Sequence, residues 1–488
     1  METLTLDRAP ELASASTLAF ALARGDGIGP EIMDATIDIL DAAGVPMQPH
    51  EIEIGEKLYR AGHSAGIAPD AWNAIDRTGL LLKAPITTPL GGGVKSLNVT
   101  MRKTLGLYAN IRPCVAYAPF VPTRFPDMDI LVVRENEEDL YAGIEHRQTD
   151  DVYQCLKLVS RSGCERIVRY AFELARAQGR RKVTCVTKNN IMKLTDGIFA
   201  QTFAEVGKDY AEIEQDHMIV DIAAARLATD PHRFDVIVTP NLYGDILSDI
   251  AAEVAGSVGL APSANIGPRA AMFEAIHGSA PDIAGQDIAN PSGLLLAACM
   301  MLDHAGFGKQ ASLVRNAWAC AVEDGRATRD AGGSLGTAAF ARAVIDRLGE
   351  EPLTIKKVSP SPRLVLDPIA AKAPAPAKRD CVGIDIFVQT TAIDPQTLAD
   401  ALRAVNGGVL ALKMITNRGV KVWPDPNPHT LLTDHWRCRF MADEGAVVTR
   451  TKAIELAFLL SRAGIDVVKT EHLYTFGGKP GYTLGQGQ

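Results

Sequence analysis

Two aspartates spaced four residues apart are the clearest candidates for metal chemistry in this sequence. Asp245 and Asp249 stand in "NLYGDILSDIAAEV", directly after the strand-like run "FDVIVTP". On a helix this spacing places both carboxylates on one face, and parallel sheets open their ligand sites at the carboxyl ends of strands. Such acids repel each other unless a cation lies between them, and oxygen ligands without nearby Cys or His favour Mg²⁺ or Mn²⁺. Asp221, near another strand end, is a third candidate. The alternative is that these acids are solvent-exposed residues in the first turns of helices, where negative charge is favourable.

A second group of residues could bind an anionic substrate. Arginine is permanently charged and planar, so three arginines at one cleft would clamp a substrate with two or three carboxylates. Taken singly, each arginine could equally lie on a solvated surface. The group consists of Ser96, Asn98, Arg102 and Arg112 in "GGGVKSLNVTMRKTLGLYANIRP" and of Arg134 at the end of "DILVVR".

The sequence also offers a proton acceptor and a proton donor. Lys188 ends the strand-like run "KVTCVTK", and Tyr141 stands in "EEDLYAG". A lysine whose pKa is lowered by nearby cations or a metal can accept a proton, and a tyrosine can donate one. Either residue alone is also compatible with a structural role.

The glycine-rich stretch "ARGDGIGPEI" does not fit a dinucleotide-binding loop. Such a loop needs G-x-G-x-x-G between a strand and a helix, and Pro30 stands where the third glycine belongs. Pro30 and Glu31 are instead typical of a helix first turn, where the carboxylate would repel a phosphate. We therefore expect any dinucleotide to be recognised elsewhere.

The elements that must position these residues are those of an α/β protein. Apolar strand-like runs alternate with amphipathic helical patterns from Thr17 to about Gly349. Near-continuous apolar strands between helices predict a mainly parallel sheet covered on both faces. The clearest strands are 17–23, 79–84, 129–135, 182–188 and 234–240, and the clearest helices are 29–43, 161–178, 192–207 and 244–255.

A change of composition near residue 357 marks a further domain. The stretch that follows is rich in Pro, Ala and Lys, which is typical of a semi-rigid linker, and we place this linker at 353–380. Residues 381–488 then predict a strand, a helix, two strands, a helix and a strand. This order favours a ferredoxin-like or ACT-like α+β domain.

The bulk composition restricts the kind of partner. The 488 residues carry a formal net charge of −8, so no overall positive field attracts nucleic acid or anionic lipid. The eight cysteines are scattered without a C-x-x-C pair, which favours reduced thiols. The most apolar run, "GLLLAACMML", is too short to span a membrane. We expect a cytoplasmic protein that binds neither nucleic acid nor membrane.

The longer motifs resemble those of the β-decarboxylating dehydrogenases, the family of isocitrate, isopropylmalate, homoisocitrate and tartrate dehydrogenases. The resemblance covers about residues 20–350 through "GDGIGPE", "ITTPLGGGVKSLNVTMRK", "RENEEDLYAGIEH", "TKNNIMK", "NLYGDILSD", "APSANIG" and "FEAIHGSAPDIAGQDIANPSG". Farther on, "GIDIFVQT", "LKMITNRG", "DHWRCRF" and "GKPGYTLGQG" resemble the bacterial homomeric isocitrate dehydrogenases with an added C-terminal domain. The chain is thereby identified as a member of this subgroup.

The resemblance implies a domain plan and an assembly. A large α/β domain would comprise 1–107 and 257–352, and a small α/β domain would comprise 108–256 with a clasp at about 139–160. The subgroup's homodimer, alone or within a tetramer, would have active sites that combine residues of two subunits.

The resemblance also implies a role for each candidate residue. Substrate would be bound by Ser96, Asn98, Arg102, Arg112, Arg134 and Tyr141, and the metal by Asp221, Asp245 and Asp249. Lys188 and Asp221 would come from the second subunit. The "SLN" tripeptide favours isocitrate, because Ser96 and Asn98 can hydrogen-bond its extra carboxylate. Homoisocitrate or tartrate dehydrogenase is the rival activity, and a non-catalytic metabolite-sensing assembly protein is the alternative of another class.

The implied reaction is the NAD-dependent oxidative decarboxylation of isocitrate to 2-oxoglutarate and CO₂, a step of the tricarboxylic acid cycle. Hydride transfer from C2 to the nicotinamide would precede loss of the β-carboxylate from oxalosuccinate. The metal, Mg²⁺ or Mn²⁺, would chelate the C1 carboxylate and the C2 oxygen. Lys188 would take the hydroxyl proton, and Tyr141 would return a proton at C3.

The coenzyme would lie against the loop "HGSAPDIAGQDIANP". Asp282 and Ile283 occupy the position that NADP-using relatives fill with Lys-Tyr. A carboxylate at Asp282 would accept hydrogen bonds from both ribose hydroxyls and repel a 2′-phosphate, so the resemblance favours NAD⁺. The other expected contacts are His277 and Asn290 on the adenine side and Thr87 and Thr88 toward the nicotinamide ribose.

Overall fold

The structure is a computed structural model that describes residues 17–63, 66–87, 96–360, 376–391, 394–426, 429–443, 446 and 448–485. The chain divides into two compact units. Unit 1 comprises Met1–Ala142 and Lys157–Ala371, and unit 2 comprises Gly143–Leu156 and Lys372–Gln488. The predicted division of the first 352 residues into a large and a small domain stays a prediction, because unit 1 holds the large domain and all of the small domain except residues 143–156.

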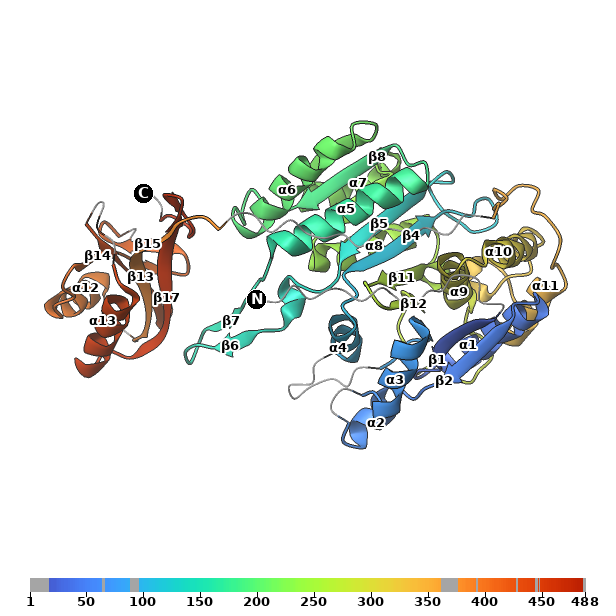
Figure 1. The fold of residues 1–488 in the computed structure, drawn as a ribbon, viewed down its shortest axis with the longest axis horizontal. Helices are drawn as coiled ribbons and strands as arrows, with labels where there is room; N and C mark the ends of the chain where they lie inside the picture. The colour runs from blue at the N-terminus through green and yellow to red at the C-terminus, as the bar shows by residue number, and fades with distance from the viewer. Residues whose placement is uncertain are drawn as a thin grey trace. The chain divides into compact units, whose positions relative to one another are not determined.

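Unit 1 is built on a ten-stranded sheet in the order β2-β1-β3-β12-β11-β4-β5-β10-β8-β9 (Figure 1). The pairs at both flanks are parallel, as expected, but β12–β11, β11–β4 and β4–β5 in the middle are antiparallel. The strands are β1 Leu18–Ala23, β2 Met47–Glu51, β3 Leu80–Lys83, β4 Ala109–Val115, β5 Asp129–Glu135, β8 Lys182–Thr187, β9 Glu214–Ile219, β10 Val236–Thr239, β11 Pro262–Ile266 and β12 Ala271–Ala275.

Helices cover both faces of this sheet. On β5, Leu131 and Val133 belong to the core beneath α5, whereas the alternate residues Ile130 and Val132 belong to the core beneath α7 and α8. This alternation follows from the two-residue repeat of a strand. The helices are α1 Gly29–Ala42, α2 Glu56–Arg60, α3 Pro69–Thr78, α4 Leu97–Thr104, α5 Arg161–Ala177, α6 Thr195–Val206, α7 Val220–Thr229, α8 Asn241–Ala255, α9 Ser292–Ala305, α10 Gly308–Glu323 and α11 Thr337–Ile345.

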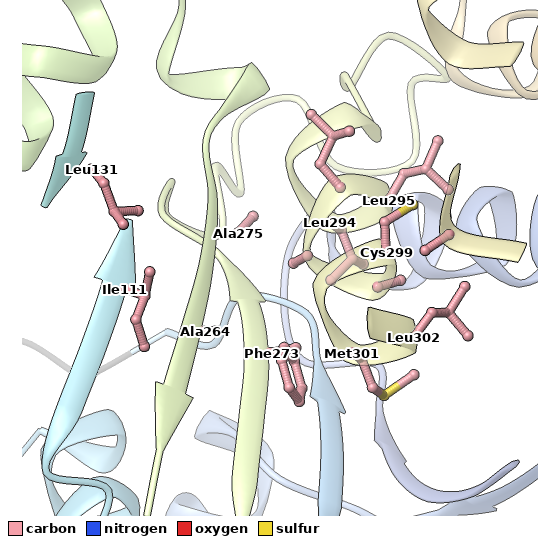
Figure 2. Close-up of a cluster of buried hydrophobic side chains, with 14 of the residues drawn as sticks. Ile111, Leu131, Ala264, Phe273, Ala275, Leu294, Leu295, Cys299, Met301 and Leu302 are labelled. Carbon is pink, nitrogen blue, oxygen red and sulfur yellow. The ribbon is translucent and has the colours of Figure 1, made fainter. Parts of the chain in front are cut away.

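Helix α9 lies at the centre of the largest core. Its sequence is apolar on every side, which is the pattern of a helix surrounded by protein. Figure 2 shows Met301 of this helix near Phe273 of β12, with Cys299 about half a turn and Leu294 about two turns toward the start of the helix. Among the described helices none is long and apolar enough to cross a membrane.

Unit 2 contains a six-stranded antiparallel sheet in the order β15-β14-β16-β13-β17-β18. Its four central strands, together with α12 and α13, have the order of a ferredoxin-like sandwich, and this confirms the predicted C-terminal fold. The short strands β15 and β18 extend the two edges. The elements are β13 Arg379–Gln389, α12 Pro395–Ala404, β14 Leu410–Asn417, β15 Val420–Trp423, β16 His435–Ala442, α13 Arg450–Arg462, β17 Val467–Phe476 and β18 Lys479–Pro480.

The clasp segment forms a hairpin of β6 (Glu145–Arg147) and β7 (Tyr153–Cys155), and it belongs to unit 2. Buried Asp434 fastens it: Thr149 Oγ1 donates to Asp434 Oδ1 at 2.6 Å, and the Asp150 N–H donates to Oδ2 at 3.1 Å. Since both groups lie at the hairpin turn, one carboxylate ties that turn to the C-terminal domain.

Candidate active site

Asp245 is the centre of a cluster of charged side chains on β4, β5 and α8. Arg134 donates a hydrogen bond to Asp245 Oδ1, and Arg112 Nη2 lies 3.3 Å from the same oxygen. The Tyr141 hydroxyl donates to Asp245 Oδ2 at 2.5 Å. The structure therefore brings together residues that were predicted separately for substrate binding, metal binding and proton transfer.

Local packing fixes both arginines. Asn241, the first residue of α8, accepts hydrogen bonds from Arg134 Nε at 3.1 Å and from Nη2 at 2.8 Å. Gly244 permits this approach, because a Cβ there would lie 2.5 Å from Arg134 Cγ. Arg112 donates from Nε to Asn110 Oδ1 and from Nη1 to Ser248 Oγ, both at 2.7 Å. Arg134 is 1% exposed and Arg112 is 4% exposed, so neither is a solvated surface charge.

The cluster shifts the pKa values of its members. Burial favours the neutral form of Asp245, but the charges of Arg134 and Arg112 hold its pKa below the ordinary value. Burial and the neighbouring Asp245 charge raise the pKa of Asp249, although Arg112 lies 3.3 Å away. Burial and the bond to Asp245 raise the pKa of Tyr141, so its hydroxyl keeps its proton at neutral pH. A protonated Tyr141 is suited to donate a proton.

Arg102 is held by a buried acid that sequence reasoning missed. Glu274 on β12 accepts a hydrogen bond from Arg102 Nη2 at 2.9 Å, and Lys83 Nζ lies 2.7 Å from its other oxygen. Burial opposes ionisation of Glu274, but Lys83 and Arg102 hold its pKa far below the ordinary value. An acid within the apolar strand "AMFEA" was the available signal. The charge of Arg102 also acts on the pKa values of Asp245 and Tyr141.

Lys188 and Asp221 form a second group. Lys188 Nζ lies 2.5 Å from Asp221 Oδ1, and the Asp221 side chain is 59% exposed. Within the described part of the chain, no three His, Cys, Asp or Glu side chains gather to hold a metal ion. A single chain therefore brings together two of the three expected metal ligands, Asp245 and Asp249 on α8, and Asp221 lies apart from them. Carboxylate oxygens are nevertheless the donors that fit Mg²⁺ or Mn²⁺.

Ser96 and Asn98 lie at the start of α4. Ser96 immediately precedes the helix, and Asn98 is its second residue. Asn98 Oδ1 is buried with no hydrogen-bond partner among the described residues. Because buried polar atoms normally have partners, this oxygen fits a role in binding.

The expected coenzyme loop packs against the glycine-rich stretch at the start of the chain. Ile28 N–H donates to the Ser279 carbonyl at 2.9 Å, and a Cβ on Gly27 would lie 1.9 Å from that oxygen. Gly27, at φ +60°, thus serves close packing between two loops. The Glu31 carboxylate accepts the Gly285 N–H at 3.1 Å and the Ala289 N–H at 3.3 Å, an anchoring role that sequence reasoning also missed.

The expected coenzyme contacts lie in different surroundings. His277 Nε2 is buried without a hydrogen-bond partner in the described chain, which fits a contact to a ligand. Asn290 is buried and donates to Asp330 Oδ2 at 2.9 Å. Thr87 contacts Ser279, with 2.7 Å between the two hydroxyl oxygens, whereas Thr88 lies outside the described residues.

Comparison with known proteins places this chain in a class of oxidoreductases. The family model described as isocitrate/isopropylmalate dehydrogenase matches residues 19–347. The model of the bacterial isocitrate dehydrogenase C-terminal domain matches residues 379–488. The chain therefore belongs to the isocitrate/isopropylmalate dehydrogenase family and carries the C-terminal domain of its bacterial isocitrate dehydrogenases, which confirms the resemblance seen in its motifs.

The chain is similar to these relatives over nearly its whole length. An isocitrate dehydrogenase (NADP) of Rickettsia bellii is 51% identical over 476 residues, which is 96% of this chain and 98% of the relative. An isocitrate dehydrogenase (NADP) of Thermus thermophilus is 44% identical over 475 residues, 95% of each chain. A crystal structure of a protein from Thermus thermophilus matches with a TM-score of 0.91 and 43% identity, covering 96% of both chains.

The expectation of an NAD-dependent enzyme is wrong, because these full-length relatives are named for NADP. It rested on Asp282 and Ile283. Ile283 is half-buried and packs on the core of unit 1, so its identity is explained by packing. The Asp282 side chain is exposed, where a charge is screened by solvent and can turn away from a phosphate. The dipeptide therefore does not decide the coenzyme.

Proposed function

We propose that this protein catalyses the NADP⁺-dependent oxidative decarboxylation of isocitrate to 2-oxoglutarate and CO₂. The charge balance of the cluster carries the proposal. Counted together with Lys83, Arg102 and Glu274, its positive side chains exceed its carboxylates by one charge, and a bound divalent cation would raise that excess to the charge of a tricarboxylate. These residues are Lys83, Arg102, Arg112 and Arg134 against Asp245, Asp249 and Glu274.

The aspartates of the cluster would hold the metal. Asp245 and Asp249, together with Asp221 of the partner subunit, supply three hard carboxylate ligands for Mg²⁺ or Mn²⁺. The bound cation would polarise the substrate oxygens and stabilise the negative charge that develops on them.

The chain's own residues would bind the substrate and move its protons. Arg112 and Arg134 would orient its carboxylates, since buried guanidinium groups with few competing waters bind anions strongly. The partner's Lys188 would take the proton of the C2 hydroxyl. Tyr141 would donate a proton to C3 after CO₂ leaves, in keeping with its raised pKa. Bound NADP⁺ supplies the hydride acceptor.

Two arginines that precede Asp330 in the sequence would bind the 2′-phosphate of NADP⁺. Arg326 and Arg329 have exposed side chains, and Asp330, the neighbour of Arg329, accepts the hydrogen bond from Asn290 in the loop. We expect replacement of both arginines by Met to raise KM for NADP⁺ about tenfold, the loss of one good ionic contact. Arg342→Met, at another exposed arginine, is the matched control. Equal KM values in the two variants would count against this contact.

Steady-state kinetics with isocitrate, homoisocitrate and tartrate test the activity. With NADP⁺ and Mn²⁺, we expect kcat/KM for isocitrate to exceed the other two values by at least about a hundredfold, the discrimination expected for a single methylene. A larger kcat/KM for homoisocitrate or tartrate would show that this acid, and not isocitrate, is the substrate. No turnover of any of the three would favour the non-catalytic alternative.

The composite site requires a homodimer, and we infer that assembly for this chain. The separation of Asp221 from the α8 aspartates supports it. The link from Asp434 to the clasp supports a role of the C-terminal domain in holding the clasp for assembly. All eight cysteines are free thiols, which supports a cytoplasmic location.

A further inference from the structure

We propose that Lys157 is a positioning residue that holds the Lys188 segment and the start of helix α8 in their working arrangement. Lys157 Nζ lies 2.7 Å from Asp196 Oδ1 and 3.2 Å from Asp139 Oδ1. It also lies 4.7 Å from the centroid of the Tyr243 ring. The Lys157 side chain is 10% exposed, and those of Asp139 and Asp196 are 2% and 0% exposed, so this is a buried ionic triad.

Asp196 connects Lys157 to Lys188. Its second oxygen, Oδ2, accepts the backbone N–H of Lys188 at 2.6 Å. Lys188 is the first residue after β8, so this bond fixes the point at which the chain leaves the strand. Because Lys157 binds Oδ1, it sets the orientation in which Oδ2 faces Lys188.

Asp139 connects Lys157 to the other catalytic elements. Its Oδ2 accepts the N–H of Leu242 in the first turn of α8, at 2.9 Å, and α8 carries Asp245. Asp139 also stands directly before the short helix Leu140–Ala142, which contains Tyr141. The Tyr243 ring beside Lys157 belongs to α8 as well.

One ammonium group therefore joins the elements that carry Lys188, Tyr141 and Asp245. Burial disfavours its charge, but Asp196 and Asp139 outweigh that cost and raise the pKa of Lys157. Without the cation, two buried carboxylates would stay uncompensated, and such groups reorient or take up protons. In the dimer of the proposed function, Lys188 serves one active site while Tyr141 and Asp245 serve the other, so Lys157 would align both.

Lys157→Met tests the inference, with Lys182→Met as matched control. Lys182 begins the strand that leads to Lys188, and it too pairs with two carboxylates, those of Glu214 and Asp216. For Lys157→Met we expect kcat with isocitrate to fall about a hundredfold, the cost of a displacement of about 1 Å, with KM changed less than about threefold. Hydrogen–deuterium exchange of residues 186–196 should accelerate. The control should show neither effect.

The double variant Lys157→Met with Asp196→Asn separates positioning from stability. An amide at Asp196 keeps an acceptor for the Lys188 N–H but removes one of the two uncompensated charges. We expect its melting temperature to return toward wild type while kcat stays low. Recovery of kcat along with the melting temperature would reduce Lys157 to a structural cation and overturn the proposal.

Hydrogen–deuterium exchange also distinguishes a failure of this inference from a failure of the proposed function on which it rests. A wild-type protein that does not oxidise isocitrate would refute the function, yet exchange of residues 186–196 would still report on Lys157. Equal exchange in Lys157→Met and Lys182→Met would overturn the positioning role whatever the substrate.

Discussion

The two units of the chain use buried charge differently. In unit 2, Arg439 donates two hydrogen bonds of 2.8 Å to the two oxygens of Asp385, and both side chains are nearly inaccessible. Within this buried pair one cation faces one acid, so the two charges balance. In unit 1, the cluster around Asp245 and the group of Lys83, Arg102 and Glu274 together hold four cations and three acids.

This difference separates structural charge from functional charge. A balanced buried pair fixes a conformation but calls for no ligand. An unbalanced buried group lowers stability, so it is retained where a ligand completes it. The excess in unit 1 thus indicates a site for an anion, whereas the Asp385–Arg439 pair indicates a scaffold.

Replacement of Asp245 is expected to have the largest effect on activity. We expect Asp245→Asn to lower kcat with isocitrate by several orders of magnitude, because a neutral amide is a weak ligand for a hard dication. Circular dichroism should show a folded protein. Near-normal turnover at saturating isocitrate and ordinary Mg²⁺ would contradict the assignment of Asp245 as a metal ligand.

Mixed dimers test whether each active site combines Lys188 of one chain with Asp245 of the other. Co-expressed Lys188→Ala and Asp245→Asn chains would form dimers with one site intact and one site lacking both residues. We expect such purified dimers to have about half the wild-type activity, since one of two sites works. Activity no higher than that of either parent variant would show that Lys188 and Asp245 act within one chain.

The motifs predicted this cluster better than they predicted its surroundings. Arg134, Tyr141 and Asp245 could be found because each stands in a long, specific motif. The bond from Arg102 to Glu274 joins residues 172 positions apart, and no local pattern records such a pair. The coenzyme prediction failed for a related reason: a dipeptide shows charge but not exposure, and Asp282 is exposed.

The fold shows the same limit. Apolar runs and helical periodicity located α1, α5 and α8 to within a few residues, because these patterns are local. The antiparallel pairs at the centre of the sheet and the attachment of the clasp to unit 2 depend on contacts distant in sequence. Periodicity contains no information about such contacts.

Asp385→Asn tests whether the buried Asp385–Arg439 pair of unit 2 has a purely structural role. The change leaves Arg439 buried without its anion, and we expect a loss of about 3–5 kcal/mol in the free energy of unfolding of unit 2. Urea denaturation followed by tryptophan fluorescence would measure it. The kcat of the folded variant with isocitrate should stay at the wild-type value; a large fall in kcat at full folding would give unit 2 a catalytic role.

Glu135, next to Arg134 on β5, gives the smallest expected effect. Burial raises its pKa from 4.5 to about 7, although its carboxylate accepts the N–H groups of Glu137 and Glu138. The folded state therefore binds this proton more tightly than the unfolded chain. Its contribution to stability is complete below pH 4.5 and is lost as pH rises through about 7, amounting to about 3 kcal/mol.

We expect Glu135→Gln to remove this part of the pH dependence, since an amide has no such proton to lose. Urea denaturation of both proteins from pH 5 to pH 8, a range of about three units around the shifted pKa, would measure it. Parallel curves for the variant and the wild type would show that Glu135 does not titrate as its burial implies.

The most direct test of the central claim is the stoichiometry of the reaction. The wild-type protein, incubated with isocitrate, NADP⁺ and Mn²⁺, should form NADPH, CO₂ and 2-oxoglutarate in equal amounts, and a chelator should abolish all three. Formation of NADPH without CO₂, or no NADPH from isocitrate at all, would contradict the account of this cluster as a decarboxylating isocitrate site.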